Sequence, residues 1–382
     1  MSLKQYWRCL MKILRAHKIR LYPNNKQATY FNRACGVSRF AYNWALSEWK
    51  RMIEAGEKVN EGILRKQLNA IKREEFPWML DVTKCAAQLA IKNDLNSAFR
   101  NFFAKRAEFP KFHKKGVNDS FALSNDQFIV EGKFVKVPNL GWVRLAEDLR
   151  FDGKIIGATI SRTADKWYIS IQVEFETELT QISENQAVGV DLGVSTLATL
   201  SDGKKFTGTK ASKKYEDKLR RLNQELSRRK GAKKGEKQSN NFKKTKRKLS
   251  RLYAKTANIR ADDSHKLTTE LTQNYSLIGI EDLNVKGMMS NHKLARSVAD
   301  MSFFEFRRQM DYKSETTNSK IIIADRWFAS SKICSSCGEK KAELTLSERT
   351  YICEMCGFIC DRDINAAINL KNYAINNNER IA

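Results

Sequence analysis

The stretch VGVDLGVSTLATL, residues 188–200, decides how the C-terminal half of the chain folds. Its valines and leucines predict two short buried strands, yet Asp191 interrupts the first of them, with Gly189 and Gly193 on either side. A carboxylate at the edge of a core loses hydration and needs hydrogen bonds or a cation in compensation. Asp191 is therefore either the opening residue of a hairpin turn or a ligand of a bound cation, and the rest of the chain has to separate the two.

The composition is that of a folded and strongly basic protein. Among its 382 residues, 69 are Lys or Arg and 43 are Asp or Glu, which gives a net charge of +26. An excess of this size predicts a polyanionic partner, and nucleic acid fits best. We expect no membrane partner, because no apolar run of the sequence reaches the roughly 18 residues of a spanning helix.

The positive charge is concentrated between residues 204 and 260, which hold 22 Lys or Arg against four Asp or Glu. Apolar residues spaced three and four apart predict an antiparallel helical hairpin over about 212–274, with a flexible tip at 231–241. Such a charge run is either a solvated helical face or a nucleic-acid contact, and we favour the contact because so much of the net charge lies here. The expected backbone-binding residues of the hairpin are Lys243, Lys244, Lys246, Arg247 and Lys248.

The N-terminal half is predicted to alternate between strands and helices. A strand is expected near residues 13–22, helices from 24 to 108 with aromatic stripes in their core, and antiparallel strands from 120 to 176. Between helices and strands, EFPKFHKKG at 108–116 combines cations with aromatic rings. This loop is either a solvated basic loop or a phosphate-backbone contact made by Lys111, Lys114 and Lys115.

Five of the eight cysteines lie between residues 334 and 360. Cys334 and Cys337 form one CxxC pair, Cys353 and Cys356 form a second, and this spacing predicts a tetrahedral zinc site of structural type. Cys360 is left out, because Cys356 completes the second pair without it. The lopsided distribution does not fit a secreted disulfide framework, so we expect a reducing, cytoplasmic compartment.

Two further acids stand at the ends of apolar elements. Glu281 ends the predicted strand YSLIGIEDL, and Asp363 begins the predicted helix of CDRDINAAINL. An N-cap is the ordinary explanation of an acid at a helix start, but one sheet could bring Asp191, Glu281 and Asp363 together. Clustered carboxylates repel unless cations lie between them, and two Mg²⁺ ions held there would suit phosphodiester cleavage.

The order of Asp, Glu, zinc ribbon and Asp resembles the TnpB family, the transposon-encoded RNA-guided nucleases related to type V CRISPR effectors. The segments that carry the resemblance over nearly the whole chain are KIRLYPNNKQ, GVSRFAYNWAL, FPKFHKKG, GVDLG, GIEDLNV and the CxxC pairs followed by DRDINAAIN. Cys360 stands where relatives often carry histidine, and Ala329 stands in place of the usual proline.

The resemblance implies an α/β and α+β multidomain protein. Its RuvC-type, RNase H-like nuclease domain would carry an inserted zinc ribbon and follow an N-terminal wedge β-barrel that a helical recognition block interrupts. The implied boundaries are a barrel strand at 1–23, the helical insert at 24–115, the rest of the barrel at 116–180, the nuclease domain at 181–331, the ribbon at 332–358, the last nuclease helix at 359–374 and a tail at 375–382.

The resemblance also implies a function and its parts. The activity would be RNA-guided, Mg²⁺-dependent cleavage of double-stranded DNA beside a short flanking motif, in a prokaryotic cytoplasm, by a monomer bound to a structured guide RNA. Asp191, Glu281 and Asp363 would be catalytic, and the four cysteines would bind zinc. Lys84 and Gln88, four apart on one helix face, would contact base edges of the flanking motif, unless they are an ordinary exposed face. A catalytically silent regulator and a strand-transferring transposase are the alternatives, although no helix-turn-helix is evident in the sequence.

Overall fold

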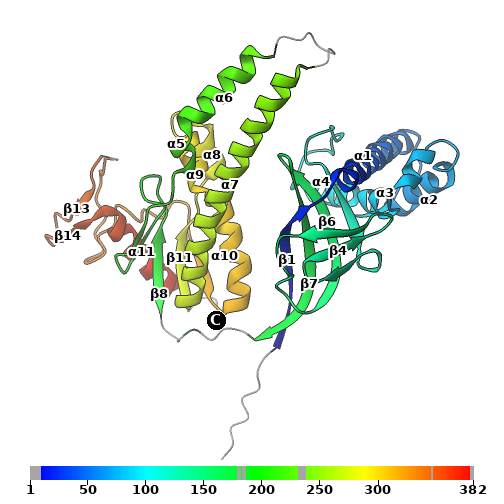
Figure 1. Ribbon diagram of the computed structural model, residues 1–382. Helices are drawn as coiled ribbons and strands as arrows, with labels where there is room; N and C mark the ends of the chain where they lie inside the picture. The colour runs from blue at the N-terminus through cyan, green and yellow to red at the C-terminus, as the bar shows by residue number, and fades with distance from the viewer. Residues whose placement is uncertain (1–9, 179–181, 183–185, 231–237, 346, 379–382) are drawn as a thin grey trace, which may run out of the picture. The chain divides into compact units, whose positions relative to one another are not determined.

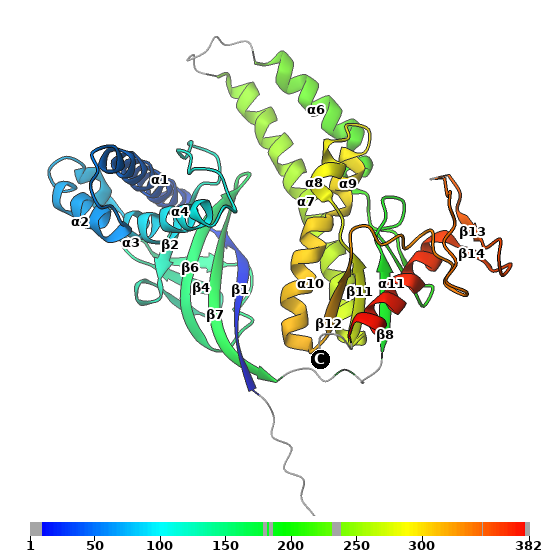
Figure 2. The ribbon, with the colours of Figure 1, turned by 180° about the vertical axis from the view of Figure 1, so that it is seen from behind.

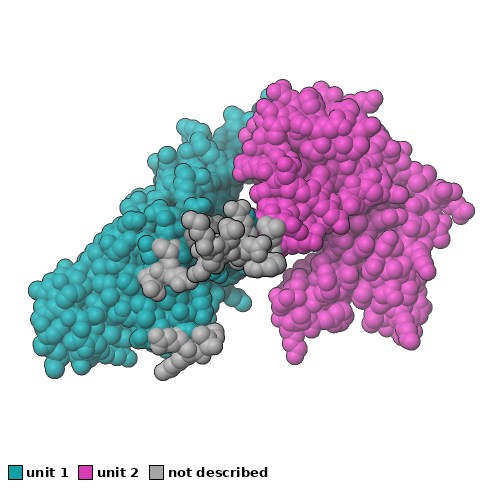
Figure 3. Space-filling model, turned by 90° about the horizontal axis from the view of Figure 1, so that it is seen from below, with its two compact units in different colours: residues 1–10, 178–382 teal, residues 11–177 magenta. Residues whose placement is uncertain are grey.

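The computed structural model describes residues 10–178, 182, 186–230, 238–345 and 347–378 (Figure 1). The chain divides into two compact units, one of residues 11–177 and one that holds residues 178–382, and Figure 3 colours them separately. The predicted hairpin tip lies mostly outside the described residues. Among the described helices, none combines the length and the apolar character that a membrane span requires.

The unit of residues 11–177 is built on a seven-stranded sheet with the order β2-β6-β7-β1-β5-β4-β3. It is a curled antiparallel sheet with β2 and β3 at its two ends, and its closure into a barrel remains a prediction. Its strands are β1 (Leu10–Tyr22), β2 (Ser120–Ser124), β3 (Ile129–Glu131), β4 (Phe134–Val137), β5 (Gly141–Leu145), β6 (Lys154–Thr163) and β7 (Lys166–Glu178).

The helices of this unit lie between the first and second strands in the sequence. They are α1 (Asn25–Glu54), α2 (Glu61–Ile71), α3 (Cys85–Leu89) and α4 (Asn96–Phe103), with a 3₁₀ turn at Pro77–Asp81 and a π-helical turn at Ala90–Leu95. A capping box starts α1 directly after Pro23, because Asn24 and Gln27 exchange side-chain to backbone hydrogen bonds of 3.0 and 2.9 Å.

Helices and sheet share one hydrophobic core in this unit. The ring of Phe31 on α1 lies 5.1 Å from that of Trp167 and 6.0 Å from that of Phe121, both on the sheet. The aromatic stripes are core residues as predicted, with the rings of Trp49 and Phe99 stacked at 3.9 Å. Phe103 is the exception, since 67% of its surface is exposed.

The unit of residues 178–382 is a layered α/β structure, as predicted. Its sheet has the order β10-β9-β8-β11-β12, in which β8, β11 and β12 run parallel and β9 and β10 continue the meander antiparallel. The strands are β8 (Ala187–Asp191), β9 (Ala198–Leu200), β10 (Lys205–Phe206), β11 (Leu277–Glu281) and β12 (Lys320–Ala324).

Helices cover both faces of this sheet (Figure 2). On one face, α7 and α10 pack against Val188, Val190, Ile278 and Ile280. On the other face, α11 packs through Ala374 against Leu277 and Ile322. The helices are α5 (Ala211–Lys214), α6 (Glu216–Arg228), α7 (Asn240–Asn274), α8 (Val285–Ser290), α9 (Ala295–Met301), α10 (Phe303–Thr317) and α11 (Arg362–Asn378).

The predicted helical hairpin is formed by α6 and α7, which run side by side in both ribbon views (Figures 1 and 2). A small apolar cluster of Leu222, Leu249 and Leu252 joins the two helices. Closer to the C-terminus, β13 (Thr350–Ile352) and β14 (Ile359–Asp361) form a two-stranded sheet beside the cysteines. Helix α11 follows directly and continues to Asn378, past residue 374 where a tail was expected.

Candidate functional site

Asp191 and Glu281 end two neighbouring parallel strands. Asp191 is the last residue of β8 and Glu281 is the last residue of β11, and Val190 is paired in register with Ile280. The carboxyl ends of parallel strands meet at one edge of a sheet, which is where α/β proteins place their ligands. The two carboxylates therefore belong to one edge, called here the acid edge. Asp191 also directly precedes the connection from β8 to its antiparallel neighbour β9, so it stands at the start of a hairpin as well as at this edge.

Asp363 comes to the acid edge on α11, which crosses the sheet over β8 and β11. The crossing depends on Gly189 and Gly279, which are paired with each other in register. A Cβ on Gly189 would lie 1.8 Å from the carbonyl oxygen of Ala367, and one on Gly279 would lie 2.3 Å from that of Leu370. Only glycine allows this approach, so the two glycines form a slot that seats the helix carrying Asp363.

The acid edge is electrostatically unfavourable without a cation. Burial, followed by the negative charges of Glu281 and Asp363, raises the pKa of Asp191 well above its ordinary value. Burial also raises the pKa of Glu281. The Ser330 hydroxyl donates a hydrogen bond of 2.5 Å to Oε1 of Glu281, and this hydrogen bond lowers the same pKa. Ionisation of Asp191 is therefore disfavoured by its burial and by its acidic neighbours, and this is a condition that a bound cation relieves.

Asp361, two residues before Asp363, has a different role. Its carboxylate accepts hydrogen bonds from the backbone N–H groups of Asp363 and Ile364 at 2.9 and 3.2 Å, so it caps α11. It also forms an ion pair of 2.7 Å with Lys205. The capping role considered for this acid pair therefore belongs to Asp361, whereas the negative charge of Asp363 helps to raise the pKa of Asp191.

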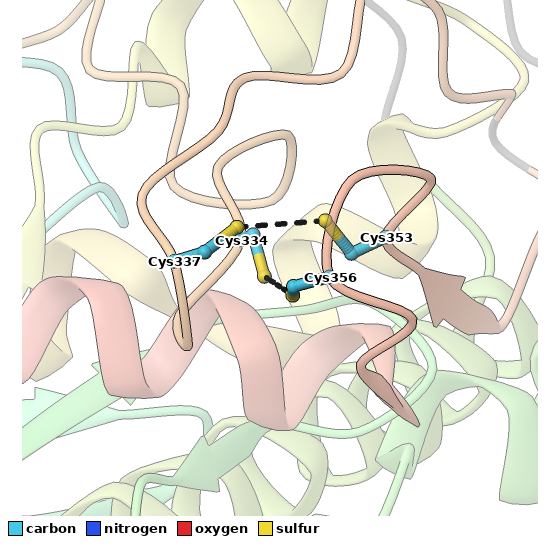
Figure 4. A group of neighbouring side chains, drawn as sticks. All are labelled: Cys334, Cys337, Cys353 and Cys356. Carbon is cyan, nitrogen blue, oxygen red and sulfur yellow. Dashed lines mark hydrogen bonds between the residues drawn. The ribbon is translucent and has the colours of Figure 1, made fainter.

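The four predicted zinc ligands lie together, and their Sγ atoms are all within 4.8 Å of one another (Figure 4). The Sγ atoms of Cys334 and Cys356 are 3.7 Å apart, and those of Cys337 and Cys353 are 3.6 Å apart. A tetrahedral zinc with Zn–S bonds of about 2.3 Å requires sulfur–sulfur distances of about 3.8 Å, so the four thiols fit zinc. Cys360 does not belong to this group, as predicted.

The turns of the cysteine cluster explain why the ligands converge. After each CxxC pair the backbone turns back through a left-handed glycine, Gly338 with φ of 82° and Gly357 with φ of 70°. Backbone N–H groups of Cys356 and Met355 donate to Cys353 and lower its pKa to about 7, which favours the thiolate that binds metal.

Two buried asparagines join the cysteine cluster to α11, and sequence reasoning missed them. Asn365 donates to the carbonyl of Ile333 at 2.7 Å and accepts from the N–H of Ser335 at 3.0 Å. Asn369 donates to the carbonyls of Ser330 and Ile333 at 2.8 and 2.6 Å. Their spacing of four within INAAIN is the signal, since it puts two amides on one face of a helix whose other small residues are buried.

The predicted nucleic-acid contacts are exposed, except for Gln88, which is half-buried. Lys84 is the N-cap of α3 and Gln88 lies one turn further on that helix, where the Gln88 N–H donates to the Lys84 carbonyl at 3.1 Å, and both line a cavity of about 300 Å³. In the loop at 108–116, Lys111 pairs with Glu108 at 2.6 Å. The cations found exposed are Lys84, Lys111, Lys114, Lys115, Lys243, Lys244, Lys246, Arg247 and Lys248.

Three family profiles match the chain. The IS605 OrfB profile, described as "Probable transposase", matches residues 170–292, and the Cas12f1-like TNB domain profile matches residues 303–370. A third profile, described as a helix-turn-helix domain, matches residues 11–58. In the structure the described residues of that range form strand β1 and the single continuous helix α1, which is not a helix-turn-helix.

Full-length relatives and one solved structure are also similar to the chain. The "Putative RNA-guided DNA endonuclease InsQ" of Escherichia coli K12 is 36% identical, over 94% of this chain and 92% of its own length. A Streptomyces pristinaespiralis protein with the same description is 32% identical, over 94% and 89%. The fold resembles that of Cas12f1 in its complex with single-guide RNA and target DNA, with a TM-score of 0.59 at 12% identity over 94% of this chain and 99% of that one.

Proposed function

The chain belongs to the IS605 OrfB/TnpB family, and from this premise we propose that it is an RNA-guided DNA endonuclease, the activity in the names of its Escherichia coli and Streptomyces relatives. The observation that carries the proposal is the convergence of Asp191, Glu281 and Asp363 at one edge of a parallel sheet, with the raised pKa of Asp191. A protein without a ligand for this place would have no physical reason to keep three acids in mutual repulsion.

The three acids act as the ligands of two Mg²⁺ ions. Oxygen ligands of this kind suit Mg²⁺, and a bound pair would supply activation of a water and stabilisation of the leaving oxygen of a phosphodiester. Ser330 fixes one oxygen of Glu281 by its hydrogen bond, which leaves the other oxygen to the cation. Helix α11 sets the position of Asp363, since the glycine slot fixes the helix against β8 and β11.

The cysteine cluster holds a structural zinc. Four thiolates fill the tetrahedral positions of the ion, so no position is open for a substrate or a water. The hydrogen bonds of Asn365 and Asn369 connect the ordered ribbon to α11, the helix that bears Asp363.

The exposed cations bind nucleic-acid backbones, and a guide RNA supplies the sequence specificity. Reading a long target by side chains alone requires many elements in the grooves, whereas Lys84 and Gln88 suit only a short flanking motif of double-stranded DNA. The cations of α7 and of the loop at 108–116 instead suit the phosphates of an RNA–DNA duplex held by its shape.

The deciding experiment compares RNA-loaded and RNA-free protein on one plasmid in Mg²⁺. We expect the RNA-loaded protein to cut at one site, and the cut to move when the guide portion of the RNA is changed. Asp191→Ala, loaded with the same RNA, is the matched control, and it should retain RNA while cleavage falls.

Two outcomes would contradict the proposal. Site-specific cutting by the RNA-free protein would remove the guide and favour a transposase-like enzyme. Unchanged binding without cleavage, in Mg²⁺ and with the native RNA, would indicate a regulator built on a nuclease scaffold.

A further inference from the structure

Trp327 is the most exposed large apolar side chain among the described residues, with 86% of its surface accessible. Tryptophan usually buries most of its large ring, so a tryptophan that packs against almost nothing has its ring available for a partner. Trp327 belongs to the segment RWFASSKICSSCG, which leads from β12 into the cysteine cluster and has no assigned part in the proposed function.

The backbone that presents this indole is held rigidly. The N–H groups of Trp327 and Phe328 donate to the side chain and the carbonyl of Asp325 at 2.8 and 2.9 Å, which forms a tight turn. The ring of Phe328 packs 4.7 Å from that of Tyr373 on α11. Trp327 is therefore exposed on a hydrogen-bonded turn whose next residue packs against α11, so the backbone that carries the ring is held in place.

The same turn is fastened to the acid edge on both sides of Trp327. Before it, the Arg326 guanidinium donates two hydrogen bonds of 2.6 and 3.0 Å to Asp282, the residue after Glu281. After it, the Ser330 hydroxyl donates to Glu281 itself at 2.5 Å. The turn that carries the exposed indole thus lies beside the end of β11, where the proposed function places the scissile phosphate.

We propose that Trp327 is the platform of a nucleotide-binding subsite, on which an unpaired base of the DNA strand at the acid edge stacks. The inference rests on the proposed function, since that function brings a DNA strand to these acids. An aromatic face binds any base, but only where the π-face of the base is not covered by its neighbours in a duplex. The occupant is therefore an unwound or displaced strand and not the intact double helix.

The subsite positions the substrate and carries out no chemistry. A base fixed on a rigid ring restricts the adjoining phosphate to one place relative to Glu281, and such restriction lowers the entropic part of the barrier to cleavage. Because stacking tolerates every base, the subsite is compatible with a nuclease whose sequence specificity comes from a guide.

The test measures binding of a single-stranded oligodeoxynucleotide, about 10 nucleotides long, to the full chain in an Asp191→Ala background. Trp327→Ala should weaken binding by about 5- to 100-fold, and Trp327→Phe by less, because the smaller ring still stacks. Phe103→Ala is the matched control, since it removes another exposed aromatic ring, 67% accessible, that has no assigned role. The thermal unfolding of Trp327→Ala should equal that of its parent, because the ring makes few contacts.

A scan with single abasic sites isolates the stacked base. One abasic position should weaken binding to the parent and leave binding to Trp327→Ala unchanged, because ring and base contribute only together. Equal loss at every abasic position, or parental affinity of Trp327→Ala, would overturn the subsite. An altered unfolding temperature or altered self-association of Trp327→Ala would also overturn it, in favour of a packing role. The assay needs neither a guide nor cleavage, so its result is independent of the plasmid experiment that tests the proposed function.

Discussion

The cysteine cluster and the acid edge are two candidate metal centres on one unit, and they are built in opposite ways. The four thiols already lie within 4.8 Å of one another, and no other His, Cys, Asp and Glu group of the described residues is so compact. The three carboxylates stand farther apart, and burial, followed by the charges of Glu281 and Asp363, raises the pKa of Asp191. A structural ion can be enclosed by protein ligands alone, whereas an ion that acts on a substrate needs open coordination positions. Carboxylates that leave such positions open repel one another until the ion binds.

Helix α11 connects the two centres. Its second residue is Asp363, and Asn365 and Asn369, two and six residues further, hold the segment leading into the cysteine cluster. Order in the cluster is therefore coupled to the position of an acid, although the two centres share no ligand.

Removal of zinc should have the largest effect. Binding free energies of structural zinc are about 10–16 kcal/mol, and they count as folding free energy where the site does not preform. A chelator should therefore unfold the ribbon, weaken the hold of Asn365 and Asn369 on it and abolish cleavage, with recovery on adding zinc but not Mg²⁺. Elemental analysis and circular dichroism of the same sample measure this, and active protein without zinc would contradict it.

The next largest effect should separate Asp363 from Asp361. Asp363→Asn removes a charge from the acid edge and should lower cleavage by about 10³-fold, as loss of several kcal/mol of metal-assisted stabilisation predicts. Asp361→Asn is the matched control, because asparagine still caps α11 and the exposed ion pair with Lys205 contributes little. Normal cutting by Asp363→Asn with loss in Asp361→Asn would mean that the assignment is reversed.

The cysteines and acids could be predicted from the sequence because their geometry is local or periodic. Two CxxC pairs bring their own thiols together, and acids at the ends of successive buried strands share an edge if those strands are parallel. The resemblance to the TnpB family supplied the choice of Asp363, and its capping partner Asp361 became clear only from the hydrogen bonds.

The parts that were missed depend on contacts between distant segments. Asn365 and Asn369 are polar residues on a helix, which ordinarily face water, and their burial follows from the carbonyls of a segment about 30 residues earlier, the Asn365 partners being 30 and 32 residues away. Gly189 and Gly279 carried a readable signal, since each stands two residues before its acid, in VGVD and IGIE. Its meaning, a slot for α11, required the sheet register. Closure of the N-terminal sheet is similarly non-local.

The slot itself can be tested by substitution. Gly279→Ala would place a Cβ 2.3 Å from the carbonyl oxygen of Leu370, so α11 must shift, at a cost of about 3 kcal/mol. The unfolding temperature should fall by roughly 6–12 °C, and cleavage should fall with it because Asp363 moves. Gly36→Ala, in the middle of α1 with its nearest neighbour at 4.0 Å, is the matched control and should be neutral or slightly stabilising. Equal stability of the two variants would remove the slot from the account of the site.

The smallest effect should show that the acid edge destabilises the protein when no cation is bound. The folded-state pKa of Asp191 is raised, so its contribution to stability is most favourable below the ordinary value of 3.8 and is lost as the pH rises through the raised folded-state pKa. Asp191→Asn removes that loss, and at neutral pH without Mg²⁺ it should unfold about 2–4 °C above the parent, as about 1 kcal/mol would produce. The difference should shrink at low pH, where Asp191 is protonated, and also in Mg²⁺, which binds the parent more tightly. Differential scanning calorimetry of both proteins measures these differences at neutral pH without Mg²⁺, at low pH and in Mg²⁺. The cysteine cluster should change stability in the opposite direction, since replacing Cys353 should lower stability, and most when its metal is present. A metal-free Asp191→Asn variant that unfolds at a lower temperature than its parent would contradict the contrast between an open and a closed centre.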